Sequence, residues 1–356
     1  MGTDPFGEKP GTAHDALLEI GREGASRRDV FKAMGATAIG AALFASAGLD
    51  PALANDLKAA EKPMKAAFSN AGLQATWCAQ GKQAAEAWGK LMNVEITWFD
   101  GELAATKQRA AIDNMASQPW DFVAIQTFGI GTLTDPIKKM IDAGIPVIAM
   151  DTMVAPEGQV DLTTFIAPDN VMMGAVSTEA LMKAIGGKGN VVMTQGALGH
   201  SGAQGRAKGF AQVVANYPDV KVINEEPADW DVTKVARIWD SVLTQNPEIA
   251  GAFFHNDDMA LAAFNVIKSK QREGIKLAGV DAMPPAVNAV IEGVMVTTVR
   301  NPSCRIHGWS VAAGVAAVAA GGKDKAGIPT FILADGPVVT AETAAGQLWL
   351  QKNFLM

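Results

Sequence analysis

The feature that most constrains the fold of this chain is a regular alternation of short apolar runs and longer amphipathic stretches. Short apolar runs without strict alternation suit strands that are buried on both faces of a sheet. The first such runs are Lys65–Ser69, Val94–Phe99, Phe122–Gln126 and Pro146–Met150. Helical patterns separate them at Ala79–Met92, Ala104–Ser117 and Leu133–Ala143. Repeated strand–helix–strand units predict a parallel sheet with right-handed crossovers.

A polar, proline-containing stretch from Val154 to Thr163 interrupts this rhythm, and a second series then begins. Its predicted strands are Asn190–Thr194, Val220–Asn224, Ile249–Phe254, Lys276–Val280 and Val294–Val299. Its predicted helices are Val171–Ile185, Ala203–Ala215, Val232–Thr244, Met259–Lys268 and Ala286–Ile291, with a last helix near Arg305–Ala320 and a short strand at Thr330–Leu333. A chain of 356 residues is long enough for two cores. We therefore expect an α/β protein with two similar doubly wound parallel-sheet lobes.

Residues 1–54 have the pattern of an export signal. Arg27 and Arg28 precede an apolar pair and Lys32, and an apolar run rich in small residues extends from Ala33 to Gly48. A small-residue cleavage site, Ala52-Leu53-Ala54, follows. This order is typical of a signal peptide, and the arginine pair resembles the twin-arginine export signal. The mature protein is expected to begin near Asn55 and to be soluble in the periplasm.

Charge and cysteine content narrow the function classes. The chain carries 37 Asp and Glu against 30 Lys and Arg, a net charge of −7, which argues against nucleic acid or an anionic membrane as a partner. Its only cysteines are Cys78 and Cys304. Two cysteines exclude a disulfide-built scaffold and a CxxC zinc site, but leave open two free thiols or a single bridge.

In parallel sheets, ligands are contacted by residues just past the carboxyl ends of the strands. Two sheets facing each other would bring such residues to one cleft, where small molecules usually bind. This rule nominates Ser69-Asn70, Asp100, Gln126-Thr127, Asp151, Gln195, Asn256-Asp257, Asp281 and Arg300.

Several short motifs, in this order and spacing, resemble those of the type I periplasmic sugar-binding proteins, whose relatives bind ribose, galactose, xylose or galactofuranose. They are Ile145-Pro-Val-Ile-Ala-Met-Asp151, Ala167-Pro-Asp-Asn170, Gly199-His-Ser-Gly-Ala-Gln-Gly-Arg-Ala-Lys-Gly-Phe210, Pro227-Ala-Asp-Trp-Asp231, His255-Asn-Asp-Asp-Met-Ala-Leu261 and Gly279-Val-Asp281. The resemblance implies two lobes joined by a three-strand hinge. It places lobe 1 at residues 63–167 plus 301–332 and lobe 2 at residues 168–300 plus 333–356.

The resemblance also implies roles for individual residues. Asp151, Asn256 and Asp281 match positions that contact sugar hydroxyls, although Asp151 and Asn256 are also suited to capping a turn or helix. Trp230 matches the aromatic residue that stacks on the sugar, with a core position as the alternative. The segment Phe68-Ser-Asn-Ala-Gly-Leu-Gln-Ala-Thr-Trp77 resembles the galactofuranose-type junction, which nominates Asn70, Gln74 and Trp77.

Three departures from the family pattern bear on the ligand. Thr152 and Gln204 stand where many relatives have arginine, whereas Arg300 stands where ribose-type proteins have glutamine. Arg206 fits a motif arginine that is more often structural. Arg300 is then the expected guanidinium of the cleft. Thr152 and Gln204 can each donate hydrogen bonds to ligand hydroxyls and accept hydrogen bonds from them. These exchanges favour a small acyclic sugar alcohol, a tetritol or pentitol, with a pentose or other monosaccharide as the alternative.

The resulting hypothesis is a monomeric solute-binding protein that delivers its ligand to the permease and ATPase subunits of an ABC importer. The chain has no G-x-S-x-G, H-E-x-x-H, Walker A or G-x-G-x-x-G motif, so an enzyme is not expected. No metal or organic cofactor is implied. A receptor of the same fold that reports a sugar or signal molecule to a membrane sensor remains the alternative.

Overall fold

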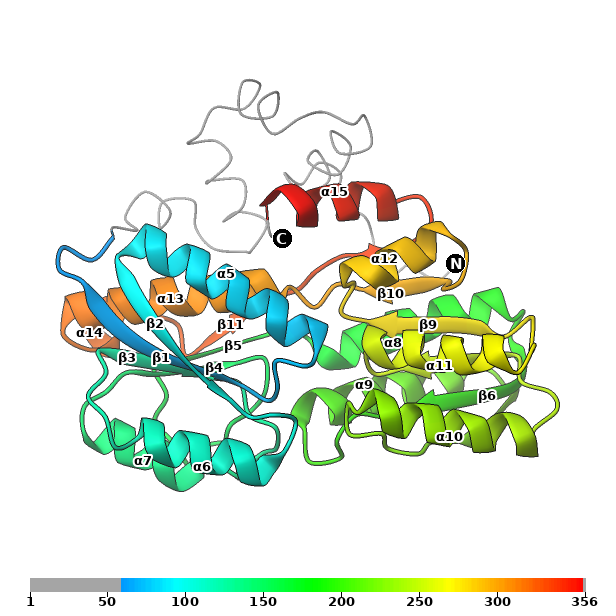
Figure 1. Cartoon of the computed structure of the whole chain (residues 1–356), viewed down its shortest axis with the longest axis horizontal. Coiled ribbons are helices and arrows are strands. Elements are labelled where there is room, and N and C mark those ends of the chain that lie inside the picture. Colours follow the sequence, from blue (N-terminus) through cyan, green and yellow to red (C-terminus); the bar gives the residue numbers. More distant parts are fainter. Residues whose placement is uncertain (1–58, 355–356) are drawn as a thin grey trace, which may run out of the picture.

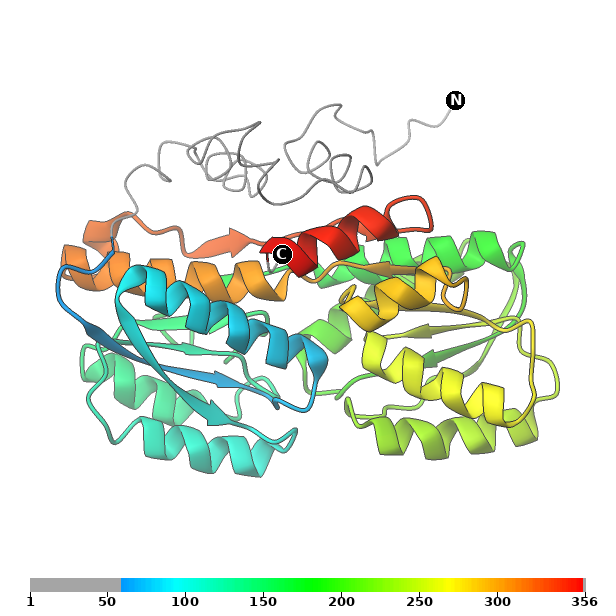
Figure 2. The same ribbon diagram turned by 45° about the horizontal axis from the view of Figure 1, so that its top comes forward.

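The computed structural model describes residues 59–354, so the predicted signal at residues 1–54 lies outside the described part of the chain. Two six-stranded sheets lie side by side, each covered by helices on both faces (Figures 1 and 2). We call each sheet with its helices a lobe. The two doubly wound α/β lobes confirm the predicted fold class. No helix within residues 59–354 is long and apolar enough to cross a membrane.

The first lobe is built on a fully parallel sheet with the order β11-β5-β4-β3-β1-β2. Its strands are β1 (Met64–Asn70), β2 (Val94–Asp100), β3 (Phe122–Ile125), β4 (Val147–Met150), β5 (Thr164–Ala167) and β11 (Phe331–Leu333). Its helices are α5 (Thr76–Met92), α6 (Ala105–Met115), α7 (Thr134–Asp142), α13 (Ser303–Ala320) and α14 (Lys323–Ala326).

The second lobe repeats this plan in the order β12-β10-β9-β8-β6-β7, with only β12 antiparallel to its neighbour. Its strands are β6 (Lys188–Thr194), β7 (Asp219–Asn224), β8 (Gly251–Phe254), β9 (Lys276–Val280), β10 (Thr297–Val299) and β12 (Val338–Val339). Its helices are α8 (Asn170–Ala184), α9 (Ser201–Val214), α10 (Val232–Gln245), α11 (Asp257–Ser269), α12 (Pro284–Ile291) and α15 (Ala344–Phe354).

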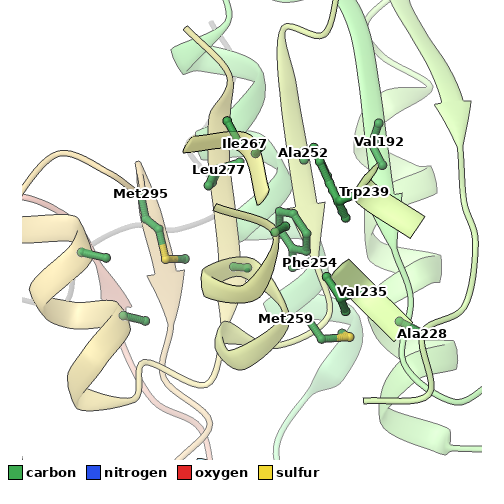
Figure 3. Close-up of a cluster of buried hydrophobic side chains, with 14 of the residues drawn as sticks. Val192, Ala228, Val235, Trp239, Ala252, Phe254, Met259, Ile267, Leu277 and Met295 are labelled. Atoms are coloured by element: carbon green, nitrogen blue, oxygen red, sulfur yellow. The ribbon is translucent and has the colours of Figure 1, made fainter. Parts of the chain in front are cut away.

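Each sheet separates two apolar cores because successive side chains of a strand point to opposite faces. In β1, Phe68 packs with residues of α5 and α13, whereas Ala67 packs with residues of α6 and α7. In β8, Phe254 joins Trp239 and Met259 in the core under α10 and α11 (Figure 3). Its neighbour Phe253 stacks on Phe210 of α9 in the other core. These cores fix the strand ends that carry the polar residues.

The chain passes between the lobes three times: from β5 to α8, from β10 to α13, and from β11 to β12. The strands β5 and β12 and the helices α14 and α15 were not predicted. β5 comes directly after the polar stretch, and β12 has only two residues, too few to show a period. The helix α15 packs against α12 of the second lobe. Cys78 and Cys304 are both buried free thiols, so the single-bridge alternative is not found.

Candidate ligand-binding cleft

The carboxyl ends of the strands in the two lobes face a common cavity. Small-molecule sites are often found in concave sites between two domains. Both lobes contribute polar and aromatic side chains to its lining. The lining residues are Ala71, Ala75, Trp77, Cys78, Leu103, Gln126, Asp151, His200, Arg206, Trp230, Asn256, Asp281 and Asn301.

Asp151 is held by the backbone immediately after β4. Its φ of 58° lies in the left-handed region, which is rare for a residue with a side chain. Its Oδ1 accepts a hydrogen bond from Asn301 Nδ2 at 2.9 Å, and its Oδ2 accepts one from Thr152 Oγ1 at 3.1 Å. Gln126 Nε2 lies 3.4 Å from the same Oδ2. The carboxylate is thus oriented by three neighbours, and it does not cap a helix.

Asp281 follows β9 in the second lobe and forms a buried ion pair with Arg206. Its Oδ1 lies 3.3 Å from Arg206 Nη2, and both side chains are about 95% buried, with 6% and 4% exposure. Burial raises the pKa of Asp281 to about 7, although the nearby positive charge of Arg206 opposes this shift. Arg206 also donates to Asn170 Oδ1 and to the carbonyl of His255. These extra bonds hold the guanidinium in place beside the cavity.

Two tryptophans line the cavity from opposite lobes. Trp77 of α5 donates from Nε1 to the Asn301 carbonyl at 3.2 Å, which fixes its ring. Trp230 has a left-handed φ of 65°, and the Arg206 guanidinium lies 5.9 Å from its ring centroid. Trp230 Nε1 is buried without a hydrogen-bond partner within the described residues. Flat, mostly buried rings of this kind can cover the C–H face of a polyhydroxy ligand.

Asn256 combines the two roles that the sequence left open. It caps α11, because its Oδ1 accepts from the Met259 backbone N–H at 3.0 Å. It also lines the cavity. Capping explains why α11 begins at Asp257, two residues before the predicted start at Met259.

Five predicted residues lie outside the cavity lining. Asn70 is buried and bonds to the Cys78 carbonyl and to His307, whereas Gln74 is exposed in the wider groove at the cleft mouth. Thr152 lies behind Asp151 and contacts His200. The remaining two residues, Gln204 and Arg300, are also absent from the cavity lining.

Gln204 is exposed and donates to the Leu198 carbonyl, so it does not face the cavity. Arg300 is buried behind Asp281, where Nη1 donates to the Asp281 carbonyl and Nη2 donates to Gln80. The guanidinium in the cavity is that of Arg206. Arg300 was expected to supply the cleft guanidinium, but its side chain is outside the cavity lining.

Three polar lining residues were not predicted as ligand contacts: His200, Arg206 and Asn301. A fourth, Gln126, is nominated by the strand-end rule alone. Helical phase could have found Arg206, because residues 204 and 206 of one helix are about 200° apart and cannot both face the cleft. Asn301 and His200 carry no sequence signal of this kind.

The lobes also touch at both sides of the cavity. Thr76 of the first lobe bonds to Asp258 of the second through its backbone N–H and its hydroxyl. On the other side, Ile130 N–H donates to the Gly199 carbonyl at 2.9 Å, and Met153 N–H donates to Ser201 Oγ at 3.0 Å. Hydrogen bonds on both sides of the cavity therefore bridge the two lobes. Among residues 59–354, no group of acidic, histidine or cysteine side chains is arranged to hold a metal ion.

Two parallel-sheet lobes enclosing a polar, tryptophan-lined cavity define a bilobal small-molecule-binding protein. Residues 66–324 match the periplasmic binding protein domain family, and the chain belongs to that family, in its type I sugar-binding branch. This confirms the family resemblance seen in the motifs. At the family level, the relatives are binding proteins rather than enzymes.

The relatives described here are 25–29% identical to this chain over the aligned residues. A xylitol-binding protein of Mycolicibacterium smegmatis is 29% identical over 265 residues, covering 74% of this chain and 73% of its own. The galactofuranose-binding protein of Escherichia coli is 28% identical over 239 residues, covering 65% and 75%. Among solved structures, a galactofuranose-binding protein has a TM-score of 0.75 at 25% identity, covering 82% of this chain and 99% of its own. An ABC transporter solute-binding protein of Mycobacterium smegmatis with bound glycerol has a TM-score of 0.73 at 26% identity, covering 80% and 97%.

Proposed function

We propose that this protein is the periplasmic solute-binding component of an ABC importer and that it binds a small sugar alcohol in the cavity between its lobes. A tetritol or pentitol is the first choice, and a monosaccharide is the second. The observation that carries this proposal is that Asp151 from one lobe and the Asp281–Arg206 ion pair from the other line the same cavity. A ligand that bonds to both sides holds the lobes together.

The chemistry of the lining suits a chain of hydroxyl groups. Each hydroxyl donates one hydrogen bond and accepts others, so it needs acceptors and donors at close range. Carboxylates supply the acceptors, Arg206 and the amide side chains of Asn256 and Asn301 supply donors, and charged partners make the stronger bonds. Asn301 Oδ1 and Trp230 Nε1 are buried without partners within the described residues. A bound polyol would satisfy such groups, which otherwise cost about 1–3 kcal/mol each.

Arg300, Gln204 and Thr152 give no support to an acyclic ligand, because none of the three side chains lines the cavity. The xylitol-binding relative and the glycerol-bound structure favour an alditol, and the galactofuranose-binding relatives support the monosaccharide alternative. Arg206 beside Trp230 is compatible with either class.

Delivery of the ligand to the importer depends on closure of the two lobes around it. The ligand bonds to both lobes, the closed population rises by differential affinity, and the closed surface docks on the membrane permease. ATP hydrolysis then takes place in a separate subunit. Export through the predicted twin-arginine signal would place the monomeric protein in the periplasm.

A thermal-shift screen tests the ligand class. Purified protein is heated with erythritol, threitol, xylitol, arabinitol, ribose, xylose or galactose, each at a large excess. A ligand at 100 times its Kd stabilises the folded protein by about 2.7 kcal/mol, which raises Tm by several degrees. A response confined to alditols supports the first choice, and one confined to aldoses supports the second. If none of these compounds raises Tm, the proposed function is wrong.

A further inference from the structure

Three buried side chains form a hydrogen-bonded chain across the cleft. His200 stands at the start of α9 in the second lobe, and its Nε2 lies 2.9 Å from Thr152 Oγ1 of the first lobe. Thr152 Oγ1 in turn lies 3.1 Å from Asp151 Oδ2. The three residues are 5%, 0% and 4% exposed, so water has little access to any of these contacts. The chain links the second lobe to the proposed ligand carboxylate of the first.

The positions of the protons follow from a neighbouring backbone group. The Gly202 N–H lies 3.1 Å from His200 Nδ1, and a backbone N–H can only donate. Nδ1 is therefore unprotonated, and the neutral ring carries its proton on Nε2. Nε2 donates to Thr152 Oγ1, whose own hydroxyl proton is then available for Asp151 Oδ2. Both hydrogen bonds of this chain are therefore donated in the direction of the Asp151 carboxylate.

The surroundings disfavour a second proton on this ring. The pKa of His200 is lowered to about 4, mainly by burial and also by the positive charge of Arg206, whereas the negative charge of Asp151 acts in the opposite sense. The ring also lies near His255 and meets the edge of Trp230 at 5.2 Å between centroids. A proton on Nδ1 would face the Gly202 N–H and the positive end of the α9 dipole.

We propose that His200 is a positioning residue that orients Asp151 through Thr152, and that the cleft closes only around its neutral, Nε2-protonated form. This proposal rests on the proposed function, because it assumes that the ligand binds in the cavity between the two lobes. When the lobes separate, His200 loses Thr152 and is exposed to water, so its pKa rises toward the ordinary value of about 6.5. Closure in mildly acidic solution then releases a proton. With pKa values of about 6.5 and 4 in the two forms, affinity falls about thirtyfold between pH 7.5 and pH 5.

Three variants separate positioning from support of the fold. His200→Asn keeps an acceptor for the Gly202 N–H but is too short to reach Thr152. His200→Gln reaches toward Thr152 with an amide N–H that does not titrate. Thr152→Val removes the middle hydroxyl at nearly constant shape. The matched control is Ser201→Ala, which removes the neighbouring bond between the lobes from Met153 N–H without touching Asp151.

The Kd for xylitol is measured by calorimetry from pH 5 to pH 8, in buffers of two ionisation enthalpies. We expect His200→Asn and Thr152→Val each to lose about tenfold in affinity at pH 7.5, with no further loss in the double variant. Proton release near pH 5.5 should disappear in both His200 variants and persist in Ser201→Ala. His200→Gln should bind more tightly than His200→Asn at pH 5. Wild-type affinity in His200→Asn, or unchanged proton release in both His200 variants, overturns the proposal.

A second measurement does not need a ligand and therefore separates this proposal from the proposed function. The double variant Ile130→Cys/Gly199→Cys places thiols on the two residues whose backbones bond between the lobes. A side chain at position 199 has no atom within 4 Å, too far for a relaxed disulfide, so a short bis-thiol cross-linker joins the two thiols and holds the lobes closed. The ¹⁵N shifts of labelled His200 should report a proton on Nε2 and a pKa at least one unit lower in the cross-linked protein than in the protein without the cross-linker. Equal pKa values in the two forms, or a proton on Nδ1, contradict the proposal even if a polyol binds.

Discussion

Asp258, at the start of α11 in the second lobe, accepts two hydrogen bonds of 2.8 Å from Thr76, the first residue of α5 in the first lobe. The N-cap residue of α5, Ala75, makes no side-chain capping bond. A carboxylate from the opposite lobe therefore satisfies the N-terminus of this helix, where negative charge is favoured. This contact exists only while the lobes are together.

Replacing Asp258 with alanine should weaken ligand binding more than it weakens the fold. The loss removes a helix-terminal contact worth about 1–2 kcal/mol, so we expect the ligand Kd to rise about five- to thirtyfold. Titration calorimetry measures this change, and Tm of the ligand-free protein should move by little. The control is Glu102→Gln, at the same cleft mouth, whose partner Lys107 lies in its own lobe. Equal Kd values in wild type and Asp258→Ala would refute the role of this contact.

Asp151→Ala and Trp230→Ala should each reduce ligand binding while leaving a folded protein. We expect a loss of about 2–4 kcal/mol in each case, the range for a buried charged partner or an aromatic hot spot. Calorimetry gives the binding energy, and circular dichroism checks the fold. Gln204→Ala is the matched control and should bind as wild type, because its side chain is exposed and bonds to Leu198. Wild-type affinity in either test variant would mean that the ligand binds elsewhere.

Asp281→Asn should stabilise the ligand-free protein at high pH while impairing ligand binding. The pKa of Asp281 is raised to about 7 by burial, so the folded state binds more protons than the unfolded state between about pH 4 and 7. The free energy of unfolding contributed by this group therefore falls as pH rises through 7. Asparagine cannot ionise, so we expect a gain of about 2–4 kcal/mol at pH 8 that vanishes near pH 4. Urea denaturation at both pH values checks this, and a constant difference between the proteins would contradict it.

Gly174→Ala should destabilise the second lobe and disturb Arg206. A methyl group on Gly174 of α8 would lie 2.3 Å from the backbone oxygen of Arg206 on α9, which is too close for any real contact. Separation of the two helices should cost about 1–3 kcal/mol. Thermal unfolding measures the effect. Gly199→Ala is the control, because its added carbon meets nothing within 4 Å. Equal Tm values for the two variants would show that the helices adjust freely.

Replacing Arg27 and Arg28 together with lysine should block export. These residues lie outside the described part of the chain, and the prediction rests on the twin-arginine pattern alone. Lysine keeps the charge but loses the guanidinium geometry on which specific recognition depends. Cell fractionation followed by immunoblotting checks the location. Normal amounts of the double variant in the periplasm would rule out this export route.

The sequence by itself determined the two parallel-sheet lobes and the family, because both depend on local patterns. Buried strands must be apolar, helices repeat every 3.6 residues, and ligand-facing residues follow strand ends. These rules correctly brought Asp151, Asp281 and Asn256 to the cavity lining. They also located most helices within a few residues. The start of α11 was predicted two residues too late, at Met259, because its capping residue Asn256 begins the helix at Asp257.

Only the tertiary structure decided which of the neighbouring polar residues faces the ligand cavity. Arg300 and Asn301 are adjacent after β10, yet Asn301 bonds to Asp151 while Arg300 is directed behind Asp281. Gln204 and Arg206 lie on one helix, and its rotation buries the arginine and exposes the glutamine. A shift of one residue in an extended segment, or two in a helix, reverses the direction of a side chain. The direction of a side chain is set by packing between elements that are distant in sequence, and local sequence patterns do not contain this information. The contact between His200 and Thr152 depends on the same long-range packing.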